Sequence, residues 1–164
     1  GKASRRLLKW PEYPGRIRGA TTMGWFDWFR NLRFFRGKKI DEIHEEDLDF
    51  EKWRSAHRQW RERLNRVMKG EEAMPDIAVV EVDNRCDLGK WLHGAGVRLY
   101  GELPLFQELL KEHAAFHRAA AQVLRHWQEG DERAARRLLN GEYEMRSMRV
   151  IADLTELERI VLER

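Results

Sequence analysis

Apolar residues recur at every third or fourth position over most of the chain, a period that is typical of amphipathic α-helices. One such run predicts a helix over 49–69, which ends at Gly70. A second run predicts a helix that starts at Pro104, a residue suited to a first turn, and continues to Gly130. The alternation of apolar and polar residues that indicates strands is nearly absent. The pattern therefore predicts a chain made of helices.

A third long helix is expected near the C-terminus. Asp131 can cap its first turn, and we expect it to bend near Asn140 and Gly141. The apolar stripe predicted for its buried face is Leu138, Met145, Met148, Ala152 and Val161.

The chain between the first two long helices is less regular. Residues 71–85 include Pro75 and predict a loop or a broken helix, which leads to a short helix at 86–93 that carries Cys86. Three long helices and one short helix must bury their apolar faces together, and an antiparallel bundle is the simplest solution. We therefore predict an all-α fold, an antiparallel four-helix-type bundle over residues 40–164.

An extra amphipathic helix, both aromatic and basic, is predicted over residues 23–39. Its apolar face consists of Trp25, Trp28, Phe29, Leu32 and Phe35. Such a face can pack on the bundle or on a second chain, which we favour, or it can lie in the headgroup layer of a membrane surface. Residues 1–22 hold six basic residues and two prolines. We expect them to be a disordered extension or sequence upstream of a natural start at Met23.

The composition fits one domain with a hydrophobic core. Of the 164 residues, 42% are hydrophobic and 36% are charged, which excludes a mainly disordered chain. The longest stretch without a charge has eight residues, Gly19 to Phe26, and is too short to span a bilayer. A single cysteine excludes an internal disulfide, and we find no pattern of an export signal, so we expect a cytoplasmic location.

Charge is divided unevenly along the chain. Residues 1–39 contain eleven Lys or Arg and two acidic residues, a net charge of +9, whereas the whole chain carries +3. The remaining residues therefore sum to −6. An acidic body lacks the basic face that nucleic-acid binding requires, so we expect no nucleic-acid partner.

Four side chains that can bind a metal are predicted to point into one core. His113 and His117 are one helical turn apart on the same face. His57 lies on the apolar face of the first long helix, and Cys86 is flanked by apolar residues. Burial without partners is unfavourable by roughly 1–3 kcal/mol for each unsatisfied group. A shared Zn²⁺ would satisfy all four groups at once.

Three imidazoles and one thiolate complete a tetrahedral zinc shell. A catalytic zinc needs an open fourth position, so this donor set argues against an enzyme. Glu112 is the one candidate for a general base, and it is expected to point away from the metal because it directly precedes His113. We therefore predict a structural or sensing site, in which Cys86 is the oxidisable ligand.

Three sequence blocks resemble the chemoreceptor zinc-binding domain (CZB) family. The blocks are HRQW at 57–60, CDLGKW at 86–91 and HAAFH at 113–117, and their first residues are 29 and 27 positions apart. The segment LPLF at 103–106 is also similar to the family. The resemblance extends over about residues 47–127 and is specific, because four ligands and their aromatic companions coincide.

The resemblance implies a helical sensory domain, often a homodimer. Its zinc ligands would be His57, Cys86, His113 and His117. In the family, such domains are usually attached to bacterial chemoreceptors or to diguanylate cyclases, which make cyclic-di-GMP, and they respond to zinc or to oxidants such as hypochlorous acid. This chain shows neither output module, so we expect a stand-alone member that acts through an unidentified signalling partner.

Two alternatives stay open at the level of sequence. Asp83 or Asp87 could hold a ligand or steer the oxidised thiol, and we favour Asp83. The alternative function is a structural zinc domain that serves as a protein-docking or membrane-surface module. A sensor releases zinc to a chelator or an oxidant under mild conditions, whereas a structural site releases zinc only on unfolding.

Overall fold

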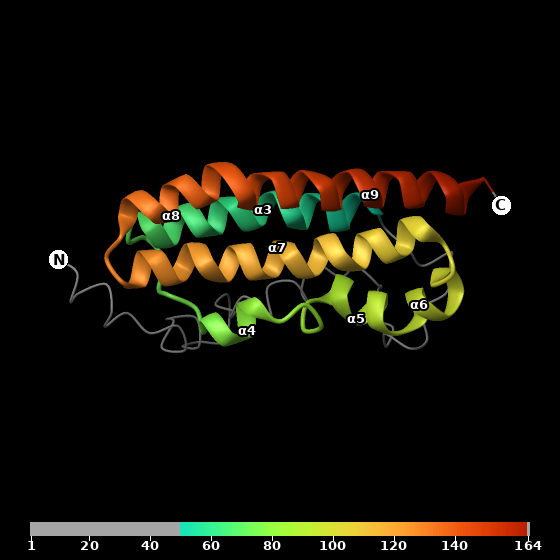
Figure 1. Cartoon of the computed structure of the whole chain (residues 1–164), viewed down its shortest axis with the longest axis horizontal. Helices are drawn as coiled ribbons and strands as arrows, with labels where there is room; N and C mark the ends of the chain where they lie inside the picture. The colour runs from blue at the N-terminus through green and yellow to red at the C-terminus, as the bar shows by residue number, and fades with distance from the viewer. Residues whose placement is uncertain (1–49, 164) are drawn as a thin grey trace, which may run out of the picture.

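The computed structural model describes residues 50–163, and every regular element in this range is a helix (Figure 1). The long helices are α3 (Phe50–Met68), α7 (Pro104–Gln128), and α8 (Glu132–Leu138) continued by the π-helical turn η4 (Leu139–Tyr143) and by α9 (Glu144–Leu162). The short helices are α4 (Ile77–Glu81), α5 (Asp87–His93) and α6 (Ala95–Tyr100). The predicted segments 1–22 and 23–39 lie outside the described residues, as does the start of the predicted domain at residue 40.

The long helices pack in an antiparallel arrangement. Near the start of α3, Arg54 Nη1 lies 2.9 Å from Glu158 Oε1 at the far end of α9. Later in α3, Arg61 donates a hydrogen bond of 3.0 Å to the carbonyl oxygen of Leu139. Helices α7 and α9 also run in opposite directions, and α4, α5 and α6 together occupy the fourth position of the bundle (Figure 1). The predicted all-α, four-helix-type bundle is therefore confirmed.

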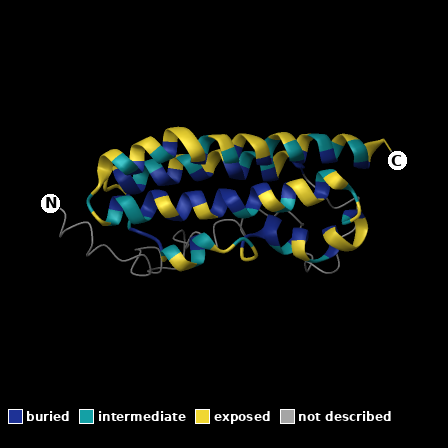
Figure 2. Cartoon of the chain, viewed as in Figure 1, coloured by how far each residue is buried: buried dark blue, intermediate teal, exposed yellow. Residues whose placement is uncertain are grey.

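The predicted core faces of the first two long helices are confirmed. Buried residues of α3 include Phe50, Trp53, Ala56, Trp60, Leu64 and Val67. The buried face of α7 continues along most of its length, from Phe106 to Trp127 (Figure 2). The four tryptophans of residues 50–163 are all buried, so they pack the core and offer no exposed stacking surface. None of the helices in this range is long and apolar enough to cross a bilayer.

The predicted buried stripe of the last helix is wrong, although its start and its bend are confirmed. Asp131 caps α8 by accepting a hydrogen bond of 3.0 Å from the amide of Ala134. The bend is the π-helical turn η4. A π-turn inserts one extra residue, so it rotates the helix that follows by about 100°. Leu138 is only partly buried and Ala152 is exposed.

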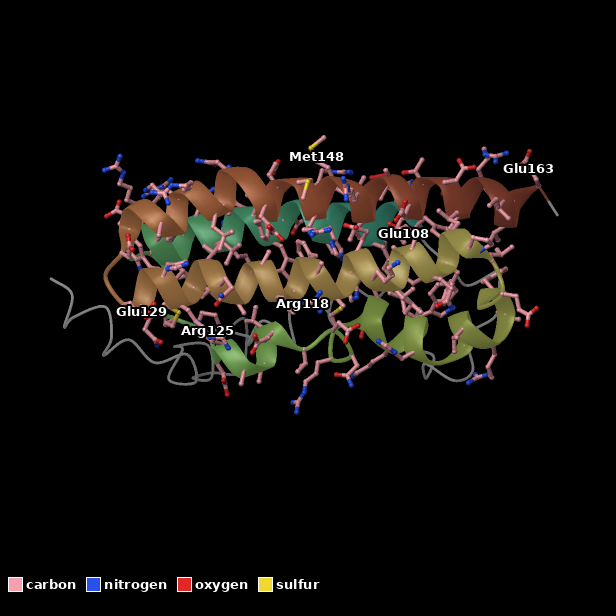
Figure 3. The ribbon with its side chains drawn as sticks, in the orientation of Figure 1. Glu108, Arg118, Arg125, Glu129, Met148 and Glu163 are labelled. Atoms are coloured by element: carbon pink, nitrogen blue, oxygen red, sulfur yellow. The ribbon has the colours of Figure 1, made fainter. Side chains whose placement is uncertain are left out.

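The buried stripe of α9 is shifted by the extra residue of η4. Its buried residues are Ser147, Val150, Leu154, Leu157 and Val161. Met145 and Met148 are instead 38% and 62% exposed, and Met148 points away from the bundle (Figure 3). Of the predicted stripe, Val161 is buried in the core and Leu138 packs against it in part, whereas the other three residues face outward.

The irregular segment between α3 and α7 holds the cysteine. Helix α4 and the turn after it confirm the predicted broken helix, and α5 confirms the predicted short helix with Cys86 as its N-cap. Helix α6 was not predicted, because Val97, Arg98 and Leu99 are exposed and the segment therefore shows no apolar period. The loop after α3 is held on that helix by a buried ion pair. In this pair Arg63 donates two hydrogen bonds, of 2.9 and 2.6 Å, to Glu72 Oε2.

Candidate metal centre

Three potential metal ligands converge between α7 and the start of α5. His113 and His117 lie one turn apart on α7, with exposed fractions of 0% and 2%. Cys86 reaches them from the turn before α5 and is 4% exposed. Three of the four sequence-predicted ligands therefore come together in a site closed to solvent.

The donor atoms of these three residues form a small triangle. Cys86 Sγ lies 3.4 Å from His113 Nε2 and 3.6 Å from His117 Nε2, and the two Nε2 atoms are 3.1 Å apart. Tetrahedral zinc, with bonds of about 2.3 Å to sulfur and about 2.0–2.1 Å to nitrogen, requires about 3.3 Å between two nitrogens and about 3.6 Å between nitrogen and sulfur. The observed edges match these lengths closely, so the triangle has the size of one face of a zinc tetrahedron.

The ring of His117 is held so that Nε2 faces the cysteine. Its Nδ1 donates a hydrogen bond of 2.8 Å to the carbonyl oxygen of Val80, at the end of α4. With the proton on Nδ1, the lone pair of Nε2 points into the triangle, as a metal ligand requires. The corresponding Nδ1 of His113 is buried and has no hydrogen-bond partner among the described residues.

Cys86 is positioned by the first turn of α5. The amide of Gly89 donates a hydrogen bond to Cys86 Sγ at 3.3 Å. A Cβ atom at Gly89 would lie 1.9 Å from the carbonyl oxygen of Asp83, so only glycine lets this turn close beneath the sulfur. The Gly89 of the sequence motif therefore has a steric role that the sequence alone does not reveal.

Burial keeps the imidazoles neutral. It lowers the pKa of His57 to about 3 and that of His117 to about 4, and it lowers the pKa of His113 well below its ordinary value. Burial raises the pKa of the Cys86 thiol to about 12. Neutral imidazoles are ready ligands, whereas the thiol has to lose its proton as the metal binds.

His57 lies beside the triangle but is not part of it. Its side chain is buried on α3, and its ring centroid is 5.6 Å from that of His113 and 4.5 Å from that of Phe116. Its Nδ1 is buried without a hydrogen-bond partner among residues 50–163. A buried imidazole with an unsatisfied nitrogen is costly unless another group, such as a metal, takes up that nitrogen.

Three acidic residues near the site, Asp83, Asp87 and Glu112, were candidates for supporting a ligand or acting as a base, and each has a different environment. Asp83 Oδ2 is 2.9 Å from Nε2 of His93, the last residue of α5. Its proposed role toward Cys86 remains a prediction. Asp87 is buried in the first turn of α5. Glu112 is buried and accepts hydrogen bonds from Arg146 on α9, at 3.0 and 3.2 Å, so its carboxylate is engaged away from the histidines.

Comparison with known proteins agrees with this geometry. Residues 57–124 match the family model of the chemoreceptor zinc-binding domain. This segment is a chemoreceptor zinc-binding domain. No curated protein and no solved structure gives a significant match to the chain. The matched range begins at His57 and contains Cys86, His113 and His117.

The family match and the donor triangle together support zinc as the metal. One sulfur and two imidazole nitrogens are a donor set that suits Zn²⁺ and does not suit Mg²⁺ or Ca²⁺, which prefer oxygen. The polar atoms that arrange this set, the Val80 carbonyl and the Gly89 amide, belong to the backbone. Sequence reasoning could not find them, because a backbone group carries no residue-specific signal.

Proposed function

We propose that this chain is a zinc-binding sensory domain whose metal is held by His57, Cys86, His113 and His117 and whose signal is zinc, an oxidant such as hypochlorous acid, or both. The observation that supports it best is the match between the donor triangle and one face of a zinc tetrahedron. His57 supplies the fourth donor in this proposal, because its ring lies beside that of His113 and carries an unsatisfied nitrogen. With four protein donors no position is left for water, so the proposal assigns no catalysis.

The oxidant response would take place at the Cys86 sulfur. When zinc is bound, the sulfur is a thiolate, and attack on hypochlorous acid gives a sulfenic acid and chloride. In this step the sulfur loses two electrons, the chlorine gains them, and the hydroxyl oxygen becomes bonded to sulfur. A sulfenic acid is a weaker ligand than a thiolate, so the turn before α5 would be released from the histidines. A domain with this chemistry belongs in a reducing compartment, which we propose to be the bacterial cytoplasm, where a partner protein of chemotaxis or cyclic-di-GMP signalling would read the change.

Oxidation of the zinc-loaded protein with up to one equivalent of hypochlorous acid tests the sensor. We expect sulfenic acid at Cys86, detected by mass spectrometry after trapping, together with zinc release, and we expect neither in Cys86→Ser. Met145 and Met148 are exposed and compete for the oxidant. The same experiment in a variant with both replaced by Leu therefore removes the exposed methionines of the described residues as competitors of the cysteine.

A structural zinc domain that docks a protein or a membrane surface is the second candidate. The burial of all three triangle residues supports it, since a closed site exchanges its metal slowly. If zinc stays bound while Met145 and Met148 oxidise, and a chelator removes it only on unfolding, this second function takes the place of the first. The aromatic segment 23–39, which this function would use, lies outside the described residues.

A further inference from the structure

Two polar links join the short helix α4 to α7. The first is the hydrogen bond from His117 Nδ1 to the carbonyl oxygen of Val80. The second is a two-pronged ion pair, in which Arg125 Nη1 and Nη2 donate to the carboxylate of Glu81 at 2.9 and 2.6 Å. Figure 3 shows Arg125 reaching from α7 toward α4. Adjacent residues of α4 thus contact the metal ligand and an arginine two turns further along α7.

The direction of α4 explains how it makes both links. Helices α4 and α7 run in opposite directions (Figure 1). The carbonyl groups of a helix point toward its C-terminus, whereas its side chains lean toward its N-terminus. The Val80 carbonyl therefore points along α7 toward His117, and the Glu81 side chain leans the other way, toward Arg125.

Polar links supplement a small apolar contact of α4 with the core, which is made by Val80 and the partly buried Ile77. The helix has five residues, too few to form a stable helix alone, and Val80 is its one buried residue. Its N-terminus is capped by Asp76, which accepts a hydrogen bond of 3.0 Å from the amide of Ala78. That cap stabilises the turn but does not hold it against α7. Any shift of α4 along α7 would move the Val80 carbonyl and also Cys86, which lies five residues after Glu81.

We propose that Arg125 is a positioning residue of the metal centre, and that its ion pair with Glu81 holds α4 so that His117 and Cys86 keep their places as ligands. The inference rests on the proposed zinc site. The side chains of Arg125 and Glu81 are 40% and 37% exposed, so salt can screen their attraction. A higher ionic strength should therefore weaken this ion pair and, with it, the zinc complex.

Zinc release from the full-length, zinc-loaded chain to a chromophoric chelator tests the proposal, at about 50 and about 500 mM NaCl. Loss of a group that orients a ligand commonly weakens metal binding 10–100-fold. Because Arg125 acts one step further away, we expect release to be about three to ten times faster in Arg125→Gln and Glu81→Gln at low salt. The double variant should be no faster than either single variant, and Arg125→Lys should lie between Arg125→Gln and the wild type.

The dependence on salt separates positioning from general stability. Salt should speed release from the wild type and have little effect in Arg125→Gln. Arg136→Gln is the matched control, because Arg136 forms a comparably exposed ion pair with Glu132, of 3.1 Å, on α8. It should release zinc as the wild type does. Wild-type release by Arg125→Gln, or faster release that keeps the full salt effect, would overturn the proposal. Failure of the wild type to bind zinc would instead refute the proposed function.

Discussion

At the scale of single residues, the site is built from side chains whose burial would be costly without a metal. His57 Nδ1 is buried without a partner among the described residues, and the thiol of Cys86 has two imidazoles within 3.6 Å. Each unsatisfied group costs roughly 1–3 kcal/mol. Zinc binding would offset this cost for the donor nitrogens and the sulfur, so we expect the metal to contribute directly to the stability of the fold.

Replacing His117 by Ala should weaken zinc binding by at least about 100-fold, because it removes a donor and also the bond to Val80. The helical circular dichroism should fall only partly, since the long helices keep their apolar faces. Isothermal titration with Zn²⁺ measures the change. His126→Ala is the matched control, because His126 lies half-buried on the same helix outside the site. Full zinc occupancy in both His113→Ala and His117→Ala would refute the ligand assignment.

Gly89→Ala should damage the cysteine turn without altering any donor. The new Cβ would lie 1.9 Å from the Asp83 carbonyl oxygen, so the turn beneath Cys86 Sγ has to open. We expect the free energy of unfolding, from urea titration, to fall by about 1–3 kcal/mol, with weaker zinc binding. Gly141→Ala is the control, because a Cβ there meets nothing within 4 Å. Equal behaviour of the two variants would contradict this account of Gly89.

At the scale of elements, periodicity predicts long helices well and short ones poorly. Helices α3 and α7 repeat their apolar positions over several turns, so their buried faces follow from the sequence. Helix α6 has six residues and offers no repeat to detect. In the last helix the period is real but its phase changes at η4, because a π-turn adds one residue without any distinctive sequence pattern. The predicted bend was therefore correct and the predicted face wrong.

Deletion of Gly141 tests whether the extra residue of η4 determines which face of α9 is buried. Removing one residue from η4 should convert it into a regular α-turn and leave Val150 and Leu154 facing the core. We expect a folded protein whose melting temperature lies within a few degrees of the wild type. Deletion of Met148 is the control, because this residue is exposed but its loss rotates the rest of α9 by about 100°. If thermal melting shows the Gly141 deletion to be as disruptive as the Met148 deletion, the phase argument is wrong.

At the scale of the whole molecule, the described residues form a bundle whose long helices cover one another. The stripe of α9 is buried against α3 and α7 within the chain, which removes one of the reasons to expect self-association. What remains is the exposed pair Met145 and Met148 on the outer face of α9 and the resemblance to a family that often forms homodimers. The homodimer, the signalling partner and the role of residues 1–39 remain predictions.

Sedimentation velocity tests self-association. A protein concentration of roughly tens of micromolar is suitable, because it is about the dissociation constant of a weak dimer. We expect a dimer for the wild type. Met148→Glu should shift it toward monomer, because a buried charge at an interface is unfavourable. Lys111→Glu serves as the control, since Lys111 is an exposed residue of α7. A wild-type monomer under these conditions would contradict the prediction.

The meeting of Cys86, His113 and His117 could be predicted from the sequence, because helical spacing places the two histidines on one face and because the resemblance to the CZB family adds the cysteine. The arrangement of the donors was not visible. It depends on the Val80 carbonyl, the Gly89 amide and the ion pair of Glu81 with Arg125. These contacts join segments far apart in the chain and follow from the packing of α4 on α7.

X-ray absorption spectroscopy at the zinc K edge of the purified, zinc-loaded protein tests the central claim most directly. We expect one zinc per chain with four ligands, one sulfur at about 2.3 Å and three imidazole nitrogens at about 2.0–2.1 Å. The Cys86→Ser protein should lose the sulfur contribution and keep the imidazole scattering of the histidines. A wild-type spectrum without sulfur, or with fewer than three imidazoles, would contradict the zinc site proposed for Cys86, His113, His117 and His57.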